Sequence, residues 1–251
     1  MEQFQRLICL IGDENYNKIK NKKILVLGLG GVGGYAVVSL IRSGIENITI
    51  IDYDTIDISN LNRQIITNID NIGKKKTDIM KEEILKINPN CNIKIIDKKL
   101  EVNNYETIFN GDIDYVIDAC DTVIVKEKVI EYCARNNIKI ISCMGTGKKL
   151  NPSMLEITDI RKTSYDPIAK IIRRYIKENK IKAKIPVVYS KEPPKNTGTT
   201  IGSFCSVVAV AGMLCSSYVI NDIINSNWFY KKIRYILYLI FNSYIELIYS
   251  I

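Results

Sequence analysis

The sequence of 251 residues contains no histidine, and its seven cysteines are scattered without a CxxC pair. Histidine and paired cysteine ligands for a structural zinc site are therefore missing. An odd number of scattered cysteines is also a poor disulfide framework, and we interpret them as reduced thiols. The first 20 residues lack the basic start, apolar run and small-residue cleavage site of a signal peptide. These absences predict a cytoplasmic protein without a zinc site.

Internal repeats and low-complexity tracts are absent as well. Hydrophobic residues make up 47% of the chain and charged residues 25%, which is ordinary for a globular protein with a sizeable core. Acidic residues are the scarcer charge, because 35 Lys and Arg face 27 Asp and Glu and leave a formal charge of +8. This excess favours polyanionic partners such as nucleic acid or nucleotides. A composition rich in Ile, Asn and Lys explains the same excess equally well.

Apolar runs alternate with amphipathic helical segments through the first 150 residues. We predict strands at 23–27, 48–51, 93–96, 115–117 and 138–142, and helices at 32–41, 74–87 and 122–135. Alternation of this kind builds a parallel sheet covered by helices on both faces. The sequence therefore predicts an α/β fold with a Rossmann-like, doubly wound and mostly parallel sheet.

The alternation loosens after residue 150. We predict strands at 155–158 and 186–189, a basic helix at 166–179 and a turn-rich loop at 191–200. The basic helix carries cations that can follow the phosphates of a nucleic acid, although a solvated amphipathic face is an equally good interpretation. These cations are Lys170, Arg173, Arg174, Lys177 and Lys180. Residues 151–251 are predicted to form a smaller C-terminal extension, facing substrate and dimer partner and continuous with the core of residues 1–150.

Two apolar stretches, at 201–220 and 233–251, raise the question of a membrane span. The first is interspersed with Gly, Ser, Ala and Cys, which favours a buried core helix. The second carries Asn242 and Glu246 near its middle, and both are costly in a bilayer. We therefore favour packing or self-association, and membrane contact through the C-terminal segment is the less favoured alternative.

Three glycines follow the first strand with the spacing G-x-G-x-x-G, at Gly28, Gly30 and Gly33. Such glycines let the backbone approach phosphates, and the following helix N-terminus adds partial positive charge. Asp52 closes the second strand 19 positions after Gly33, where it can accept hydrogen bonds from ribose hydroxyls. The pattern predicts a nucleotide site, with NAD, FAD and ATP all open and a purely structural glycine turn as the alternative.

The next stretch favours ATP over a hydride carrier. Attack on an α-phosphate builds negative charge that fixed cations must meet, and Arg63 and Lys76 are suitably placed for this. Asp54 or Asp121 can hold Mg²⁺ through carboxylate oxygens.

The GLGGVG loop at 28–33, the DxDxxxxxNxxRQ string at 52–64 and the following Lys76 together resemble a known domain. They are similar to the adenylation domain shared by ubiquitin-activating enzymes and the bacterial activators of sulfur-carrier proteins. Within that family the resemblance narrows to the tRNA threonylcarbamoyladenosine dehydratases and spans residues 3 to about 224. Supporting segments lie at 3–6, 60–65, 87–89, 115–121, 144–147, 157–160 and 188–194.

The resemblance implies a role for each matching residue. Gly30 and its neighbours would face the phosphates of ATP, Asp52 the ribose, and Asp121 the α-phosphate with its Mg²⁺. The residues implied to bind the nucleotide are Gly28, Gly30, Gly31, Gly33, Asp52, Asp54, Asn60, Arg63, Gln64, Lys76, Asp118 and Asp121. The implied catalytic residues are Arg63, Lys76, Asp121 and Arg6. In relatives an N-terminal Arg reaches into the partner subunit's site, so Arg6 implies a homodimer.

The implied reaction is carboxyl activation. ATP converts the threonyl carboxylate of a modified adenosine beside the tRNA anticodon into an acyl-adenylate, and the neighbouring carbamoyl group then closes a ring and expels AMP. The reaction needs proximity and no enzyme nucleophile. We therefore interpret Cys205 as a buried cysteine of an apolar helix rather than a reactive thiol.

Departures from the family keep alternatives open. The segment 195–200 is shorter than the cysteine-rich and basic insert common in relatives, and the tail from Trp228 has no counterpart. An adenylyltransferase that activates the C-terminal glycine of a sulfur-carrier protein, with a sulfur-transfer protein as partner, is the second interpretation. A Rossmann module or dehydrogenase that binds NAD is the third, and it leaves Asn60, Arg63, Gln64 and Lys76 without a role.

Overall fold

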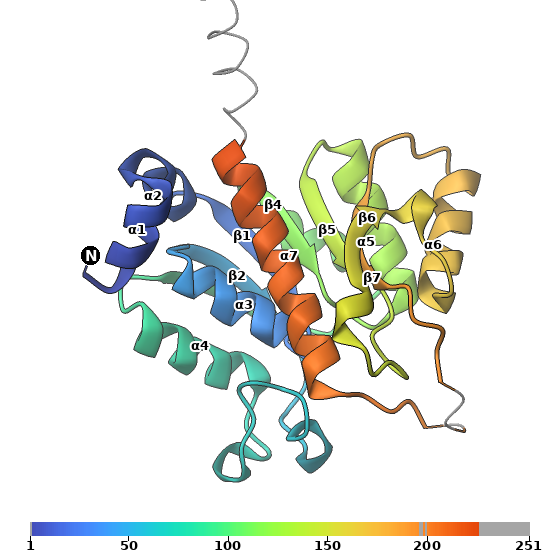
Figure 1. Cartoon of the computed structure of the whole chain (residues 1–251), viewed down its shortest axis with the longest axis horizontal. Coiled ribbons are helices and arrows are strands. Elements are labelled where there is room, and N and C mark those ends of the chain that lie inside the picture. Colours follow the sequence, from blue (N-terminus) through green and yellow to red (C-terminus); the bar gives the residue numbers. More distant parts are fainter. Residues whose placement is uncertain (1, 196–197, 199, 226–251) are drawn as a thin grey trace, which may run out of the picture.

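The computed structural model describes residues 2–195, 198 and 200–225. Seven strands form a sheet in the order β3-β2-β1-β4-β5-β7-β6 (Figure 1). All neighbouring pairs are parallel except β6 with β7. The strands are β1 (Lys23–Leu27), β2 (Asn47–Ile51), β3 (Asn92–Ile96), β4 (Tyr115–Asp118), β5 (Lys139–Cys143), β6 (Leu155–Asp159) and β7 (Pro186–Ser190).

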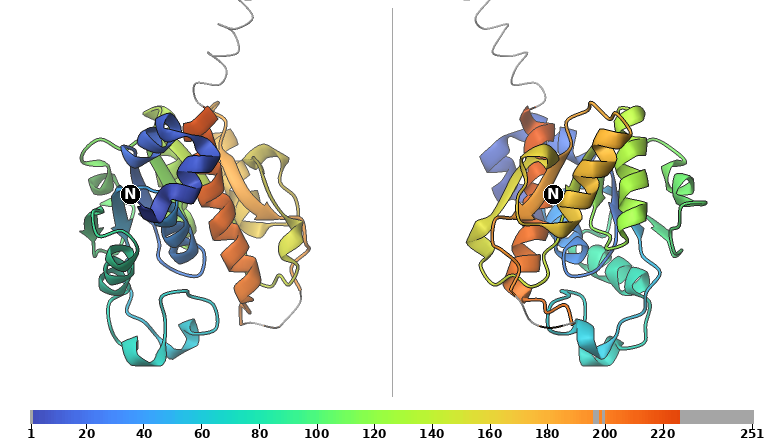
Figure 2. Two further views of the ribbon diagram at one scale, coloured as in Figure 1. Left: turned by 60° about the vertical axis from the view of Figure 1, so that its left-hand side comes forward. Right: turned by 90° about the vertical axis from the view of Figure 1, so that its right-hand side faces the viewer.

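Helices cover both faces of this sheet (Figures 1 and 2). Alternate strand residues point to opposite faces, so Ile24 and Val26 join one buried cluster while Leu25 and Leu27 join the other. The first cluster is completed by α2, α3, α4 and α7, and the second by α5 and α6. The helices are α1 (Gln5–Ile11), α2 (Asp13–Lys20), α3 (Gly33–Arg42), α4 (Lys76–Ile87), α5 (Val123–Arg135), α6 (Pro167–Glu178) and α7 (Cys205–Asn225). The predicted doubly wound α/β fold is confirmed.

The sequence analysis did not predict the two N-terminal helices, α1 and α2. Both are shorter than nine residues, and their apolar residues only acquire a partner in the folded chain. Tyr16 and Ile19 of α2 are buried, and Tyr16 packs against Gly44 just after α3, where an added Cβ would lie 2.6 Å from its ring. Helix α2 therefore covers the C-terminal end of α3.

The segments after residue 150 complete the same sheet. Strand β7 continues it beside β5 through the pairs Ser142↔Val187 and Cys143↔Val188, and β6 forms the antiparallel edge. Helix α7 runs beside α3 (Figure 1), and Gly212 allows the close approach, because a Cβ there would lie 2.3 Å from the Val32 carbonyl oxygen. The described residues between 151 and 225 thus pack on the same sheet as residues 2–150.

Helix α7 accounts for the first apolar stretch. Among the described residues it is the one helix long and apolar enough to cross a membrane. Of its most apolar 18 residues, 44% are buried inside the protein. Val207, Ala211, Cys215 and Val219 are buried, and the last three belong to the cluster that covers the sheet. The predicted core helix is confirmed. The second stretch, at 233–251, lies outside the described residues.

Strands β1 and β4 are neighbours from which the chain leaves toward opposite faces of the sheet, β1 into α3 and β4 into α5. Open α/β sheets bind ligands at such a switch point, outside the carboxyl ends of the strands. The loops after β1, β2, β4 and β5 all lie along this carboxyl edge.

Candidate active site

The glycine loop joins β1 to α3 and touches the loop after β4. Gly28 has φ 88°, in the left-handed region, and a Cβ there would lie 2.8 Å from the Ala119 carbonyl oxygen. A Cβ on Gly33 would lie 1.7 Å from the Gly28 carbonyl oxygen. Both glycines are therefore demanded by the packing of the chain itself.

The two middle glycines differ from these and from each other. A Cβ on Gly31 would come within 3.0 Å of Val208, so this glycine admits α7 to the loop. A Cβ on Gly30 would meet a single atom of the described structure within 4 Å, the Gln64 Nε2 atom at 3.9 Å. Val32, at the N-cap of α3, has no side-chain cap. Open space at Gly30 beside an amide donor and an uncapped helix N-terminus is an arrangement suited to phosphate.

Asp52 ties the glycine loop to the end of β2. Its Oδ2 accepts a hydrogen bond from the Leu29 N–H at 2.6 Å, and its Oδ1 accepts one from the Asp54 N–H at 2.9 Å. A carboxylate has about four lone-pair sites, so acceptor capacity remains for a ribose hydroxyl. Asp52 thus has a structural task that the sequence pattern did not indicate, and its contact with ribose stays a prediction.

Lys76 is the first residue of α4 and is almost fully buried. Its Nζ lies 2.7 Å from Asp54 Oδ2, and its N–H donates to the Asp54 carbonyl oxygen at 3.0 Å. The Lys76 side chain is 6% exposed, whereas that of Asp54 is 46% exposed. The amine is thus held in place by one of its three donors.

Asn60 organises the turn that carries the other predicted cation. It ends the short helix η2 (Ile58–Asn60), its Oδ1 accepts from the Asp57 N–H at 3.1 Å, and its carbonyl accepts from the N–H groups of Arg63 and Gln64. The Arg63 guanidinium donates to the Ser59 carbonyl at 2.7 Å. Within the described part of the chain Arg63 makes no salt bridge, so its charge is not neutralised by a carboxylate.

Gln64 completes the surroundings of Gly30. The side chain is buried, and its Oε1 has no hydrogen-bond partner in the described structure. Its Nε2 is the polar atom nearest to the open side of Gly30. An unsatisfied buried amide costs about 1–3 kcal/mol, which indicates a place where a polar ligand completes the structure.

Asp118, at the end of β4, has a different position from the one expected. It is fully buried, and its Oδ2 lies 2.8 Å from Lys126 Nζ and 2.5 Å from Ser142 Oγ. Its Oδ1 accepts from the Cys120 N–H at 3.2 Å. The structure therefore does not bring Asp118 to the open side with the other predicted residues, because its carboxylate is occupied in holding the loop after β4.

Lys126 is a residue that the sequence analysis missed. Its side chain is fully buried, and its amine donates hydrogen bonds to Asp118, to Ser142 Oγ and to the Cys143 carbonyl. Burial by itself lowers the pKa of Lys126, but the charge of Asp118 and its hydrogen bond outweigh this effect and raise the pKa above its ordinary value. Its position on the apolar face of α5, beside Val125 and Val129, was the available signal.

Asp121 lies on the open side, at the start of α5, and is exposed. The negative charges of Asp54, Asp121 and Asp52 raise the pKa of Tyr53, which indicates that these carboxylates gather around the ends of β2 and β4. Asp54 is paired with Lys76 and Asp52 with backbone N–H groups, whereas the one donor to Asp121 within residues 2–195, 198 and 200–225 is Thr122 Oγ1, at 3.4 Å. In the described residues no three His, Cys, Asp or Glu side chains form a metal cluster.

The model of the ThiF family matches residues 4–239. The chain belongs to the ThiF family. It is 35% identical over 242 residues to the tRNA threonylcarbamoyladenosine dehydratase of Bacillus subtilis, with 89% of this chain and 95% of the relative covered. It is 34% identical to the dehydratase of that name from Escherichia coli, with 86% and 84% covered.

The solved structure of the Escherichia coli dehydratase in complex with ATP superimposes with a TM-score of 0.85 at 32% identity. The match covers 90% of this chain and 95% of that one. The same enzyme has also been solved with AMP, again at a TM-score of 0.85. Both the family and its Rossmann-like fold, which the sequence motifs predicted, are thus confirmed.

In this ThiF-family chain Arg6 lies far from the glycine loop. It is exposed on α1, which packs against α2, and α2 covers the C-terminal end of α3. The glycine loop lies at the N-terminal end of α3, about 15 Å away along the helix. The structure therefore does not bring Arg6 to the site of its own chain, and its role in a partner's site stays a prediction.

Cys205 differs from the expectation of a buried core cysteine. It is half-buried as the first residue of α7, and its Sγ lies 3.1 Å from the Tyr35 hydroxyl of α3. Burial and the neighbouring Cys205 raise the pKa of Tyr35 to about 12. The cysteine on the buried face of α7 is instead Cys215, whose thiol is fully buried.

A second group of buried charges lies at the carboxyl end of β5 and was missed by sequence analysis. Asp166 caps α6 through Oδ1, which accepts from the Ala169 N–H at 2.8 Å, and burial raises the pKa of its carboxyl group. Its Oδ2 lies beside Gly145, 3.1 Å from the position of an added Cβ. Lys149 is 3% exposed, donates to the Glu192 carbonyl, and has its pKa lowered by burial.

Proposed function

We propose that this protein uses ATP to cyclise threonylcarbamoyladenosine in tRNA through a carboxyl-adenylate. The observation that carries the proposal is the open space at Gly30, with Arg63 held in the loop after β2 and Lys76 held at the start of α4. The names of the relatives, which match over most of the chain, support the same activity. Proteins of this chemistry act where tRNA is, so we expect the protein in the cytoplasm.

The residues present fit the phosphates of ATP. The space at Gly30 admits an oxygen-rich group next to the Gln64 amide, and the unneutralised charge of Arg63 attracts it. Lys76 keeps free donors because Asp54 uses only one of them. In a partly buried site, each such cation stabilises negative charge that develops on the α-phosphate.

Asp121 fits the role of a Mg²⁺ ligand. Magnesium is commonly held by one or two carboxylates together with substrate phosphates, and it neutralises phosphate charge when bound. Asp121 is the exposed carboxylate of the group around Tyr53 that has no cation or backbone N–H partner among the described residues, whereas Asp52 and Asp54 have such partners. Asp118 then acts as a positioning residue, because its bonds to Lys126 and Cys120 fix the loop that carries Asp121.

A carboxylate is a poor electrophile because its leaving group would be oxide, and ATP supplies an adenylyl group that leaves as AMP. One carboxylate oxygen bonds to the α-phosphorus and pyrophosphate departs. The carbamoyl group of the same nucleoside then attacks the carbonyl, and AMP leaves with that oxygen. The chain contributes orientation and charge, since an intramolecular attack needs no protein nucleophile.

The dimer belongs to the same proposal. Arg6 is exposed on α1, which packs on α2 beyond the C-terminal end of α3, whereas the glycine loop lies at the N-terminal end of α3. A homodimer in which Arg6 enters the partner's nucleotide site accounts for its position. Residues 1–150 then serve as the adenylation domain, and residues 151–251 as an extension that faces tRNA and the partner.

The proposal is tested by mass spectrometry of the nucleosides of tRNA before and after incubation with protein, ATP and Mg²⁺. We expect threonylcarbamoyladenosine to lose the mass of one water only when all components are present. Unchanged tRNA, combined with pyrophosphate exchange that depends on an added sulfur-carrier protein, would favour the carrier activator instead. Tight binding of NAD without binding of ATP would contradict both.

A further inference from the structure

The positive charge of the chain is concentrated in one segment. Residues 161–184 hold nine of the 35 Lys and Arg but only two of the 27 Asp and Glu, which accounts for +7 of the formal charge of +8. One of the two acidic residues, Asp166, is buried beneath α6. The other 227 residues are nearly neutral, with 26 basic and 25 acidic side chains. A general compositional bias would spread the excess along the chain, so this concentration calls for a local cause.

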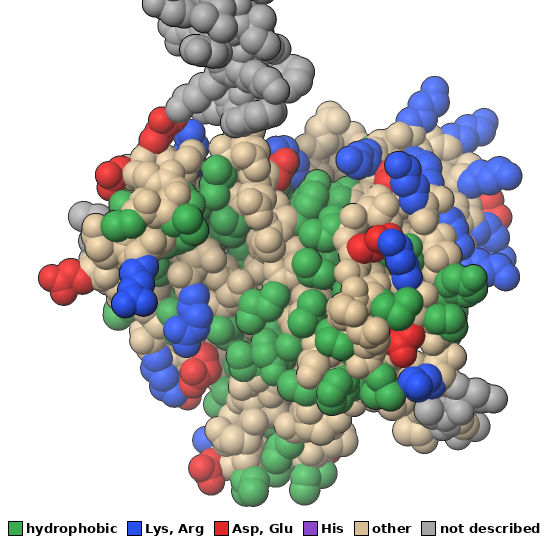
Figure 3. Space-filling model, in the orientation of Figure 1, with side chains coloured by type: hydrophobic (Ala, Val, Ile, Leu, Met, Phe, Trp, Pro, Cys, Tyr) green, Lys and Arg blue, Asp and Glu red, His purple; other side chains and the backbone are tan. Residues whose placement is uncertain are grey.

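The cations of this segment lie on one surface. Helix α6 buries Ala169, Ile172 and Ile176, while Lys170, Arg174 and Lys177 on its other side are exposed. The following loop adds three more exposed lysines before β7. Figure 3 shows basic side chains gathered on the side of the molecule where Figure 1 places α6. We define the basic surface as Lys162, Lys170, Arg174, Lys177, Lys180, Lys182 and Lys184.

Most of these charges have no anionic partner inside the protein. None of the six lysines of the basic surface makes a salt bridge with any described residue, and Arg174 makes only a long one, 3.8 Å to Glu178. Elsewhere exposed lysines are commonly paired, as Lys23 is with Asp112 and Lys75 with Asp97. Like charges held together on a folded surface repel each other, and a bound polyanion relieves that repulsion.

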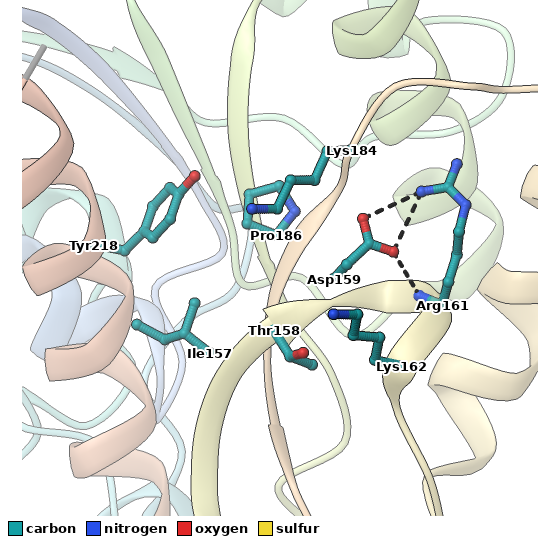
Figure 4. Close-up of a pocket in the computed structure, with 8 residues that line it drawn as sticks. All are labelled: Ile157, Thr158, Asp159, Arg161, Lys162, Lys184, Pro186 and Tyr218. Atoms are coloured by element: carbon teal, nitrogen blue, oxygen red, sulfur yellow. Dashed lines mark hydrogen bonds and ion pairs between the residues drawn. The ribbon is translucent and has the colours of Figure 1, made fainter. Parts of the chain in front are cut away.

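The end of the basic surface borders a pocket of about 540 Å³ between β6, β7 and α7. Figure 4 shows Tyr218 of α7 on one side and Arg161 and Lys162 on the other. Arg161 is neutralised by Asp159, so Lys162 and Lys184 supply the net charge of the pocket. Two free amines and a phenol hydroxyl around a hollow suit a phosphate group and its sugar.

Lys180 occupies a backbone position that favours glycine. The end of α6 closes with the Ile181 N–H bonded to the Ile176 carbonyl at 3.0 Å, and Lys180 has φ 53°. Helices that end in this way usually place glycine at that position, because a side chain is strained there. The chain therefore carries a charge where an uncharged glycine fits the backbone better.

Helix α6 connects the basic surface to the edge that holds the active site. Its N-cap residue Asp166 packs beside Gly145, which follows the carboxyl end of β5, and the 12 residues of the helix lead away from that edge over about 18 Å. A nucleic acid bound along α6 therefore has one end at the carboxyl edge and the other at the pocket. RNA duplexes are recognised largely through their phosphates and 2′-hydroxyls, and an extended surface of unpaired cations is suited to bind these phosphates.

We propose that the basic surface binds the phosphate backbone of the tRNA stem that adjoins the modified nucleoside. The proposal rests on the proposed function for the identity of the RNA, and it adds where the RNA lies. The stem runs along α6, and a phosphate at its far end enters the pocket between Lys162 and Lys184.

The test measures binding of fluorescently labelled tRNA to the full chain by anisotropy at several salt concentrations. We expect the triple variant Lys170→Ala, Arg174→Ala and Lys177→Ala to bind at least about tenfold more weakly, and its plot of log Kd against log salt to be shallower by about 2–3. A matched triple variant on α4 and β3, Lys81→Ala, Lys86→Ala and Lys94→Ala, should bind like the wild type. Equal Kd values and salt slopes for the wild type and the α6 variant would overturn the proposal.

Lys180→Gly provides a second variant in which unfolding is not a concern. Glycine relieves the strained backbone, so this variant should melt at or above the wild-type temperature while its Kd for tRNA rises. An unchanged Kd would count against the basic surface. Nucleoside analysis of the same samples separates the two proposals. If the wild type binds tRNA through this surface without cyclising the nucleoside, only the proposed function is contradicted. If the α6 variant is fully active with an unchanged KM for tRNA, only the proposal of the basic surface is contradicted.

Discussion

The loops around β1, β2 and β4 and the segment around α6 use charge in opposite ways. In the first region most charged side chains are engaged within the protein, as Asp52 is with two N–H groups and Asp118 is with Lys126. Along α6 the lysines lack such partners in the described structure. Charges with internal partners hold loops in position, whereas charges without them are available to a ligand. Arg63 and Asp121 are exceptions in the first region, because among the described residues neither of them makes an ion pair.

The substitution Lys126→Met is expected to have the largest effect among charged side chains that are paired within the protein. The variant leaves the Asp118 carboxylate buried without its cation, so we expect the free energy of unfolding to fall by about 3–5 kcal/mol in denaturant titrations. The double variant Lys126→Met, Asp118→Asn removes both charges and should recover part of the loss. A loss below about 1 kcal/mol for the single variant would show that the pair does not hold the loop.

Lys76→Ala tests the cations of the first region. Removal of a fixed donor to the developing phosphate charge should lower kcat/KM for tRNA cyclisation by about 10²-fold. The neighbouring Lys75→Ala is the matched control, because Lys75 pairs with Asp97 on the surface and should leave activity within about twofold. Equal activities of the two variants would remove Lys76 from the catalytic site.

Much of the first region could be predicted from sequence because its signals are local. The spacing of Gly28, Gly30 and Gly33 directly after an apolar strand indicates the turn, and the family motif adds Arg63 and Lys76. The split of roles within the glycine loop could not be predicted, since it depends on which distant segment each glycine meets: Val208 for Gly31 and Ala119 for Gly28.

The positions of buried charged residues were the part of the site that the sequence predicted least well, because they too depend on contacts between distant segments. Asp118 was expected beside the nucleotide, but its partner Lys126 comes from the face of α5 that packs on the sheet, which spacing alone does not reveal. The same holds for Asp166, whose neighbour Gly145 lies on another element. Helices α1 and α2 escaped prediction because tertiary packing supplies most of the stability of such short helices.

Gly31→Ala and Gly30→Ala separate glycines that serve packing from those that serve a ligand. A Cβ on Gly31 presses on Val208, and we expect it to lower the free energy of unfolding by about 1–3 kcal/mol. A Cβ on Gly30 meets no protein atom closer than 3.9 Å, so the thermal midpoint should hold while ATP binds about tenfold more weakly, as calorimetry can measure. If both variants lost the same stability and the same affinity for ATP, the two glycines would not differ in their roles.

The smallest expected effects concern Asp166. Loss of its cap on α6 in Asp166→Ala should cost about 1 kcal/mol of stability, whereas Asp166→Asn retains the acceptor for the Ala169 N–H. Burial raises the pKa of the Asp166 carboxyl group, so the folded protein holds its proton more tightly than the unfolded chain does. The wild type should therefore lose stability as the pH rises from about 4 through the raised pKa.

Asp166→Asn has no carboxyl group to titrate, so it should lack this part of the pH dependence. Melting curves of the wild type and Asp166→Asn between about pH 4 and pH 7 make the comparison directly. Parallel pH profiles for the two proteins would mean that Asp166 does not titrate in this range.

The fate of a carboxylate oxygen tests the central claim most directly. The substrate tRNA is prepared with ¹⁸O in the threonyl carboxylate and incubated with the protein, ATP and Mg²⁺, and the phosphorus products are then analysed by mass spectrometry. Transfer of the adenylyl group predicts one ¹⁸O in the AMP formed with each cyclised nucleoside and none in pyrophosphate. Cyclisation that yields unlabelled AMP, or ¹⁸O in inorganic phosphate released with ADP, would contradict it.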